Sequence, residues 1–243
     1  MSRKKITSLI ICISLLIVLN VSLVFTTQIN GYLYNVLENK FNIISADNNL
    51  RVHYISVGNG DAIAINLPDR KTVLIDTGTT KYANTYVNYI EQKVLPFDDD
   101  GKIDCLILSH ADADHIGGTV HLLDSVEIKL TYVPWLDSSS DSKTYSNTME
   151  AIENKTQSTK TGKDEVIDMG EYKISFLGPV NLGDTNNSCQ LIKLEYMDKV
   201  FLFVGDIESD TESTYVSAYG DELDCDVLKV AHHGSNSSTS DTF

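Results

Sequence analysis

The chain has 243 residues, of which 42% are apolar and 22% charged, and its 34 acidic and 19 basic residues give a formal net charge of −15. This length suits one domain of moderate size or two small ones, and the composition excludes collagen-like, coiled-coil and broadly disordered chains. The acidic balance argues against non-specific binding to nucleic acid or to an anionic membrane surface.

The N-terminus combines basic residues with a long apolar run. Arg3, Lys4 and Lys5 precede residues 6–25, of which 15 are apolar. At about 1.5 Å per residue this run can cross a bilayer, and the basic residues before it predict a cytosolic N-terminus with the remaining chain outside. The alternative is a cleaved signal peptide, although such apolar regions usually span about 7–15 residues. We therefore predict a membrane anchor or signal sequence over 1–25, a linker over 26–49 and a domain over 50–243.

Residues 26–243 carry 16 basic and 34 acidic residues, a net charge of −18. Three cysteines remain in this part, Cys105, Cys189 and Cys225, each in an apolar, strand-like run. An odd number of cysteines cannot pair completely within one chain, so buried free thiols are expected.

From residue 50 onward, short strands separated by turns alternate with helices. Strands are predicted at 52–57, 62–67, 72–76, 103–108, 128–133, 172–177, 189–196, 200–204 and 226–230. Helices are predicted at 81–95 and near 208–219, and residues 115–123 are predicted to begin a helix. The polar segment 136–163 is predicted as a loop with one helix around 148–153. This order favours an α/β sandwich built around two sheets.

Chemistry-bearing residues are concentrated after the predicted strand 103–108, in the sequence SHADADHIGG at 109–118. It holds His110, Asp112, Asp114 and His115, which cannot all share one face of a helix or strand. A turn can point all four side chains inward, as a metal cluster requires. The alternative is an Asp-rich helix cap with solvated histidines.

Two further strands end in residues of the same kind. Strand 200–204 is followed by Gly205 and Asp206, and strand 226–230 by the sequence HHGS at 232–235. Asp206 alone would be a common turn residue or helix cap. Three strands that each end in metal-binding residue types indicate one shared site.

In this order, the three motifs resemble those of the metallo-β-lactamase superfamily, and more narrowly those of the hydrolase domain of the ComEC/Rec2 competence proteins. The sequences VGNGDA at 57–62 and LIDTG at 74–78 also resemble turns of that group. The resemblance covers residues 50–235 and implies a four-layer αββα sandwich with a metal site at one edge. Further strands and helices follow the HHGS turn in the resembled domain, so we expect this sandwich to be incomplete at its C-terminus.

The resemblance also implies roles for the individual side chains. It assigns six metal ligands: His110 and Asp112 to one ion, Asp114, His115 and His232 to the second, and Asp206 as a bridge. Most superfamily members have His where Asp112 stands, and the stretch 186–188 lacks a further expected His. The resemblance thus implies two divalent ions, Zn²⁺ or Mn²⁺. Imidazole ligands favour Zn²⁺ whereas carboxylates shift the preference toward Mn²⁺ or Mg²⁺, so the sequence leaves the identity of the metal open.

The expected catalytic residues are Asp114 and His233. The implied nucleophile is a hydroxide held between the two ions, so no Ser or Cys nucleophile is required. His233 is expected to contact substrate or to donate a proton to the leaving oxygen, with a supporting hydrogen bond to a ligand as the alternative. Asp61 and Asp76 are expected to orient ligands or strand turns.

The resemblance implies an extracytoplasmic, membrane-anchored, metal-dependent phosphodiesterase or nuclease, with DNA outside the cell as one candidate substrate. The charge of −18 opposes tight binding of a polyanion. The alternatives are hydrolysis of a small phosphoester, a cell-wall phosphodiester or a lactone, a secreted rather than anchored enzyme, and a metal-stabilised surface domain that binds a partner without turnover. The sequence leaves the protein partners unknown.

Overall fold

The computed structural model describes residues 49–137, 142–159 and 164–243. The predicted anchor, residues 1–25, and all but the last residue of the predicted linker, residues 26–49, lie outside the described residues. In the described part, no helix has both the length and the apolar character needed to cross a membrane.

The first sheet has six strands in the order β1-β2-β3-β4-β5-β6. They are β1 (Arg51–Tyr54), β2 (Ile63–Asn66), β3 (Thr72–Ile75), β4 (Ile103–Ile107), β5 (Ile128–Tyr132) and β6 (Gln157–Thr159). The strands β1 to β3 pair antiparallel, and β3 to β6 pair parallel. All residues of β2 and β3 are buried, as expected for strands covered on both faces.

The second sheet has five strands in the order β11-β10-β9-β8-β7. They are β7 (Val166–Asp168), β8 (Tyr172–Leu177), β9 (Leu191–Tyr196), β10 (Lys199–Phe203) and β11 (Val227–Lys229). The strands β7 to β10 pair antiparallel, whereas β10 and β11 are parallel. Each sheet therefore contains a parallel pair, β3–β4 or β10–β11, whose carboxyl ends meet at one edge.

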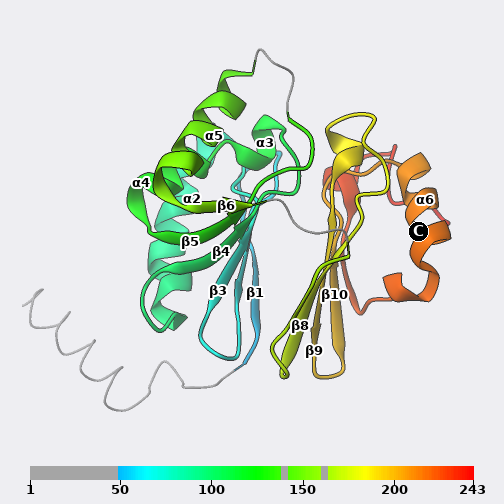
Figure 1. Cartoon of the computed structure of the whole chain (residues 1–243), viewed down its shortest axis with the longest axis horizontal. Helices are drawn as coiled ribbons and strands as arrows, with labels where there is room; N and C mark the ends of the chain where they lie inside the picture. The colour runs from blue at the N-terminus through cyan, green and yellow to red at the C-terminus, as the bar shows by residue number, and fades with distance from the viewer. Residues whose placement is uncertain (1–48, 138–141, 160–163) are drawn as a thin grey trace, which may run out of the picture. The chain divides into compact units, whose positions relative to one another are not determined.

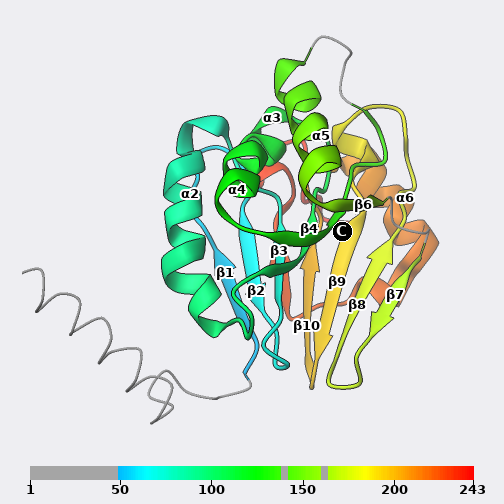
Figure 2. The ribbon, with the colours of Figure 1, turned by 60° about the vertical axis from the view of Figure 1, so that its left-hand side comes forward.

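Helices cover the outer face of each sheet (Figures 1 and 2). The first sheet is covered by α2 (Ala83–Tyr89), α4 (Thr119–Ser125) and α5 (Lys143–Lys155), and the second by α6 (Ser209–Tyr219). The short helix α3 (Ala113–Ile116) follows the end of β4. The chain after α2 continues through a π-helical turn, Ile90–Val94, so the predicted helix 81–95 is observed as one irregular helical run.

Three hydrophobic clusters fill the spaces between these four layers. Tyr86, Leu106 and Ile152 belong to the cluster between the first helices and the first sheet. A second cluster, which includes Ile65 and Phe176, lies between the sheets. The third packs α6 on the second sheet around the buried side chain of Tyr215, whose hydroxyl donates to the carbonyls of Leu177 and Cys189 at 3.2 and 2.8 Å. The fold is thus a two-sheet α/β sandwich, as predicted.

Most predicted strands are observed within one or two residues at each end, and β8 has the predicted bounds. Two strands, β6 and β7, were not predicted. The residues of β6 are all exposed, and the first and last residues of β7 are exposed as well. Neither strand shows the alternation of apolar and polar residues that identifies a half-buried strand. The helix predicted around 148–153 is longer than expected, because Ser142 caps its N-terminus by accepting from the Tyr145 N–H at 3.2 Å.

Candidate metal centre

Asp76 organises the loop that follows β4. It lies directly after β3 in the left-handed region, with φ of 56°. Its Oδ1 accepts the Ser109 N–H at 2.8 Å, and its Oδ2 accepts the Ser109 hydroxyl at 2.7 Å. The same Oδ2 lies 2.8 Å from His115 Nδ1. Because Asp76, Ser109 and His115 are all buried, this network fixes the His115 ring and leaves its Nε2 pointing away from Asp76.

Asp206 lies opposite His115, at the end of β10. The preceding Gly205 has φ of 58°, and a Cβ at this position would lie 2.7 Å from Cys189 Sγ, so the turn requires glycine. The Asp206 N–H donates to Cys189 Sγ at 3.3 Å. Asp206 Oδ2 then lies 3.2 Å from His115 Nε2, which joins the carboxyl end of β10 to that of β4.

Asp61 enters the site from the loop between β1 and β2. The neighbouring Gly60 packs so closely that a Cβ would lie 2.3 Å from the Asp114 carbonyl oxygen, and this contact brings the loop against α3. Asp61 Oδ1 lies 3.2 Å from His233 Nδ1, and its Oδ2 lies 2.8 Å from Lys229 Nζ. Both carboxylate oxygens are therefore already paired.

The turn that follows β11 carries the two consecutive histidines. His232 and His233 have φ of 48° and 53°, a left-handed conformation that costs about 1–2 kcal/mol per residue. His233 Nε2 lies 3.2 Å from Asp206 Oδ2 and 3.3 Å from Asp114 Oδ2. His232 is more distant, with its Nε2 3.9 Å from Asp206 Oδ2. Backbone strain of this kind is typical of functional sites.

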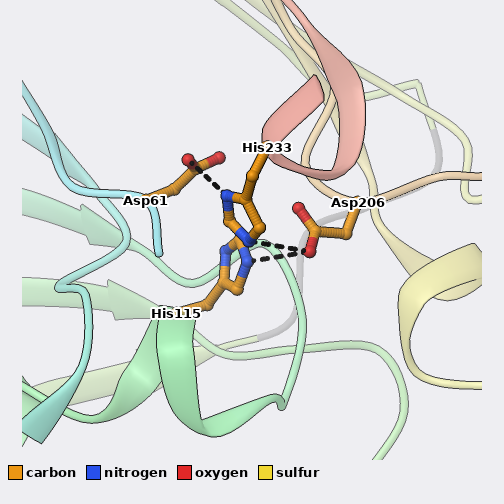
Figure 3. Close-up of side chains that lie close together, drawn as sticks. All are labelled: Asp61, His115, Asp206 and His233. Atoms are coloured by element: carbon orange, nitrogen blue, oxygen red, sulfur yellow. Dashed lines mark hydrogen bonds and ion pairs between the residues drawn. The ribbon is translucent and has the colours of Figure 1, made fainter. Parts of the chain in front are cut away.

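All the residues assigned to the site by sequence lie at this one edge of the sandwich. The tightest group is Asp61, His115, Asp206 and His233, whose ligand atoms all lie within 4.8 Å of one another (Figure 3). His110 lies beside it, with its ring centroid 4.0 Å from that of His115 and its Nε2 3.8 Å from Asp112 Oδ2.

The position of Asp61 beside His233 and the contact of Lys229 with Asp61 were not predicted from the sequence. The sequence VGNGDA marked the Asp61 turn, but the identity of its partner depends on how two distant segments pack. Lys229 lies only three residues before His232 in the chain. An isolated lysine at the end of a strand carries no signal of its own.

The site contains buried polar atoms that make no hydrogen bond within the described structure. They are His110 Nε2, His232 Nδ1 and Asp206 Oδ1, whereas His115 Nε2 and His233 Nε2, which also lack a well-aligned hydrogen bond, each face Asp206 Oδ2 at 3.2 Å. Buried polar atoms are almost always paired, and imidazole nitrogens and carboxylate oxygens are ligands for divalent metals such as Zn²⁺ and Mn²⁺. The residues present therefore fit divalent metal binding.

The carboxylates and imidazoles strongly perturb one another. Burial alone would raise the pKa of Asp206, but His115 and His233, each 3.2 Å away, hold it well below its usual range. Burial alone would lower the pKa of His115, but Asp76 and Asp206 raise it to about 10. Asp114, Asp206 and Asp61 raise the pKa of His233 to about 11. In contrast, burial and the charge of His115 lower the pKa of His110 to about 4. Such clusters of perturbed groups mark functional sites.

The family model of the metallo-beta-lactamase superfamily matches residues 55–243. The chain belongs to this superfamily. Among curated proteins it is 30% identical over 211 residues to ComE operon protein 3 of Bacillus subtilis, and 28% identical over 200 residues to competence protein ComA of Neisseria gonorrhoeae. It is also 30% identical over 196 residues to recombination protein 2 of Haemophilus influenzae. These alignments cover 79%, 81% and 79% of this chain but only 26%, 26% and 22% of the relatives.

Solved structures of metallo-β-lactamases share the fold of this superfamily member. MEM-A1, a subclass B3 enzyme from a soil metagenome library, has a TM-score of 0.54 at 15% identity, covering 75% of this chain and 76% of that one. SMB-1 bound to 2-mercaptoethanesulfonate has a TM-score of 0.52 at 14% identity with the same coverage. At these identities the likeness shows the fold alone. The superfamily and the geometry of the site together indicate a metal-dependent hydrolase.

Proposed function

We propose that this chain is an extracytoplasmic, membrane-anchored phosphodiesterase that uses two divalent ions. The observation that carries the proposal is the convergence of His115 Nε2 and His233 Nε2 on a single oxygen of Asp206, each at 3.2 Å. The names of the competence and recombination relatives favour a phosphodiester as the substrate, and DNA is one candidate. The ligands proposed for the two ions are His110, Asp112, Asp114, His115, Asp206 and His232.

Two carboxylates orient the histidines that face Asp206. Asp76 holds His115 through Nδ1, and Asp61 holds His233 through Nδ1. Each ring therefore presents only its Nε2 to the reacting centre. When bound, divalent ions supply Lewis acidity that lowers the pKa of a water molecule and offsets charge on phosphoryl oxygens.

His233 is placed to handle a proton during bond cleavage. Its Nδ1 is paired with Asp61, and its Nε2 faces Asp114 and Asp206. A proton carried on Nε2 is available to the leaving oxygen of a phosphodiester that takes the place of one of these carboxylates as the partner of Nε2. Burial alone would raise the pKa of Asp61, but His233 and then Lys229, whose Nζ lies 2.8 Å from Asp61 Oδ2, hold it below its usual range. Asp114 and His233 are thus the proposed catalytic residues.

A small phosphodiester is the second candidate substrate. The acidic composition outside the predicted anchor, 34 acidic against 16 basic residues, opposes long polyanions. Because a short diester carries one negative charge, it approaches such a surface with less repulsion than a DNA strand. A competition between the two substrates at several salt concentrations distinguishes them, since cleavage of DNA depends far more steeply on salt.

The test is hydrolysis of bis-p-nitrophenyl phosphate by the full chain, purified in detergent and supplied with Mn²⁺ or Zn²⁺. We expect turnover that EDTA abolishes, and loss of turnover in Asp206→Asn with metal supplied. Asp210→Asn, which removes an exposed carboxylate of α6, is the matched control and retains activity. Absence of turnover with Mn²⁺, Zn²⁺ and Mg²⁺, by a protein that binds metal, would rule out the phosphodiesterase. Plasmid DNA, single-stranded DNA and small diesters are then compared to define the substrate.

A further inference from the structure

A carboxylate outside the metal centre is completely buried. Glu212 lies in the first turn of α6 and has no exposed surface. Among the described residues no basic side chain lies within ion-pair distance of it. A buried carboxylate without a cation is costly unless hydrogen bonds satisfy its oxygens. Its position therefore requires specific donors.

Those donors are backbone groups of the segment that follows the histidine turn. Glu212 Oε1 accepts the Thr239 N–H, and Oε2 accepts the Ser240 N–H at 2.9 Å. A second link runs beside the first, because the Ser209 N–H donates to the Ser237 carbonyl oxygen at 3.0 Å. The start of α6 thus holds the segment 237–240 through hydrogen bonds to the backbone of that segment. Two of these three bonds are accepted by the Glu212 carboxylate.

The same segment holds the histidine turn. Thr239 Oγ1 accepts the Ala231 N–H at 3.2 Å, directly before His232. The Ser235 N–H donates to the His232 carbonyl oxygen at 2.8 Å, and the His232 N–H donates to the Gly205 carbonyl oxygen at 3.0 Å. Since both histidines have left-handed backbone conformations, the turn persists only if its surroundings fix it.

We propose that Glu212 is a positioning residue that holds the His232–His233 turn in the conformation that binds metal. It links the two ligand-bearing strand ends of the second sheet: α6 begins three residues after Asp206, and the segment bound by Glu212 closes the loop after β11. The proposal rests on the metal centre of the proposed function and is independent of its substrate. A mobile histidine turn would still permit folding but would weaken metal binding.

Two variants test this link without changing side-chain shape. Glu212→Gln places an amide NH₂ against a backbone N–H, so that one of the two hydrogen bonds is lost. Thr239→Val removes the acceptor for the Ala231 N–H and retains the size of the side chain. Asp210→Asn, two residues before Glu212 on the exposed side of α6, is the matched control.

The measurements are Mn²⁺ and Zn²⁺ affinities of the full chain by chelator competition, and hydrogen–deuterium exchange of the metal-free protein. We expect both test variants to bind metal more weakly than the unmodified chain, by at most about the 10–100-fold loss that follows removal of a group hydrogen-bonded directly to a ligand. We also expect faster exchange confined to residues 230–243. Because the two bonds act in one chain of contacts, the double variant is expected to lose less affinity than the sum of the single losses.

Wild-type metal affinity in Glu212→Gln, or faster exchange spread over both sheets, would show that Glu212 serves general stability and would overturn the proposal. If Glu212→Gln does not fold, Thr239→Val decides by the same two criteria. A protein that binds metal normally but cleaves no diester would refute the proposed function and leave this inference standing.

Discussion

Asp61 precedes His233 by 172 residues, yet its Oδ1 lies 3.2 Å from His233 Nδ1. The pair joins the β1–β2 loop of the first sheet to the turn after β11 of the second (Figure 3). The same relationship recurs between Asp76 and His115, whose Nδ1 lies 2.8 Å from Asp76 Oδ2. Two carboxylate–histidine pairs therefore approach Asp206 from different loops, and each fixes the direction of one Nε2.

Replacement of Asp61 tests the first of these pairs. In Asp61→Asn the negative charge that pairs with Lys229 and with His233 Nδ1 is lost, so the ring is held less firmly. We expect metal affinity, or turnover at saturating metal, to fall about 10–100-fold, as measured by chelator competition and by diester hydrolysis. Asp124→Asn, which changes an exposed carboxylate paired with Lys155, is the control. Equal affinity and activity in both variants would show that Asp61 has no orienting role.

The close packing around Gly205, directly before Asp206, predicts that replacing this glycine destabilises the fold more than replacing Gly170. Gly205 and Gly170 both have positive φ, but a Cβ on Gly205 meets Cys189 Sγ at 2.7 Å, whereas one on Gly170 meets nothing within 4 Å. Gly170→Ala is expected to lower the free energy of unfolding by about 1–2 kcal/mol, because of backbone strain alone. Gly205→Ala also forces the new Cβ against Cys189 Sγ, so we expect it to lower the free energy of unfolding by about 1–3 kcal/mol more. Urea unfolding in EDTA measures both, and equal losses would contradict the packing argument.

The charge network predicts how the metal-free protein responds to alkali. Burial alone would lower the pKa of His115, but Asp76 and Asp206 raise it to about 10, above its ordinary value of 6.5. The folded state therefore binds this proton more tightly than the unfolded chain does. The resulting stabilisation is complete below about pH 6.5 and is lost as the pH rises through about 10.

Urea unfolding of the metal-free protein between about pH 7 and pH 10 checks this sign. We expect the free energy of unfolding to fall across the range in the unmodified chain. The fall is expected to be smaller in Asp76→Asn, which lacks the carboxylate on His115 Nδ1. An identical pH dependence in the two proteins would show that Asp76 does not hold the proton on His115.

The apolar run at residues 6–25 predicts the cellular position of the hydrolase. We expect the full chain to remain with the membrane fraction after alkaline washing, and a protease added outside the cell to remove the domain over 50–243. A chain that begins after residue 25 and is preceded by a cleavable export signal is expected to be recovered in soluble form. Recovery of the unmodified chain in the medium, shortened at its N-terminus, would favour the secreted form instead.

The sequence predicted the apolar part of this fold well because burial dictates residue type there. Strands such as β8 and β9 are recognised from their runs of large apolar residues, and the ligand types at the ends of β4, β10 and β11 indicated a shared site. The edge strand β6 was not predicted because its residues, Gln157–Thr159, are all exposed and none of them is apolar.

The supporting residues of the site were harder to predict, since their roles depend on contacts between distant segments. Glu212 has the sequence context of an ordinary acidic residue in the first turn of a surface helix, and only the fold shows that it is buried. The partnership of Asp61 with Lys229 likewise depends on how the first sheet packs beside the second. Motif spacing identifies ligands, but the groups that orient them are set by tertiary packing.

This edge of the sandwich is expected to bind divalent metal through Asp206 and its histidine partners. The most direct test of this binding is the metal content of the full chain after dialysis against Mn²⁺ or Zn²⁺, measured beside that of Asp206→Asn. We predict two equivalents of metal in the unmodified chain and loss of at least one in the variant. A folded, unmodified chain that retains no divalent metal under these conditions would contradict this expectation.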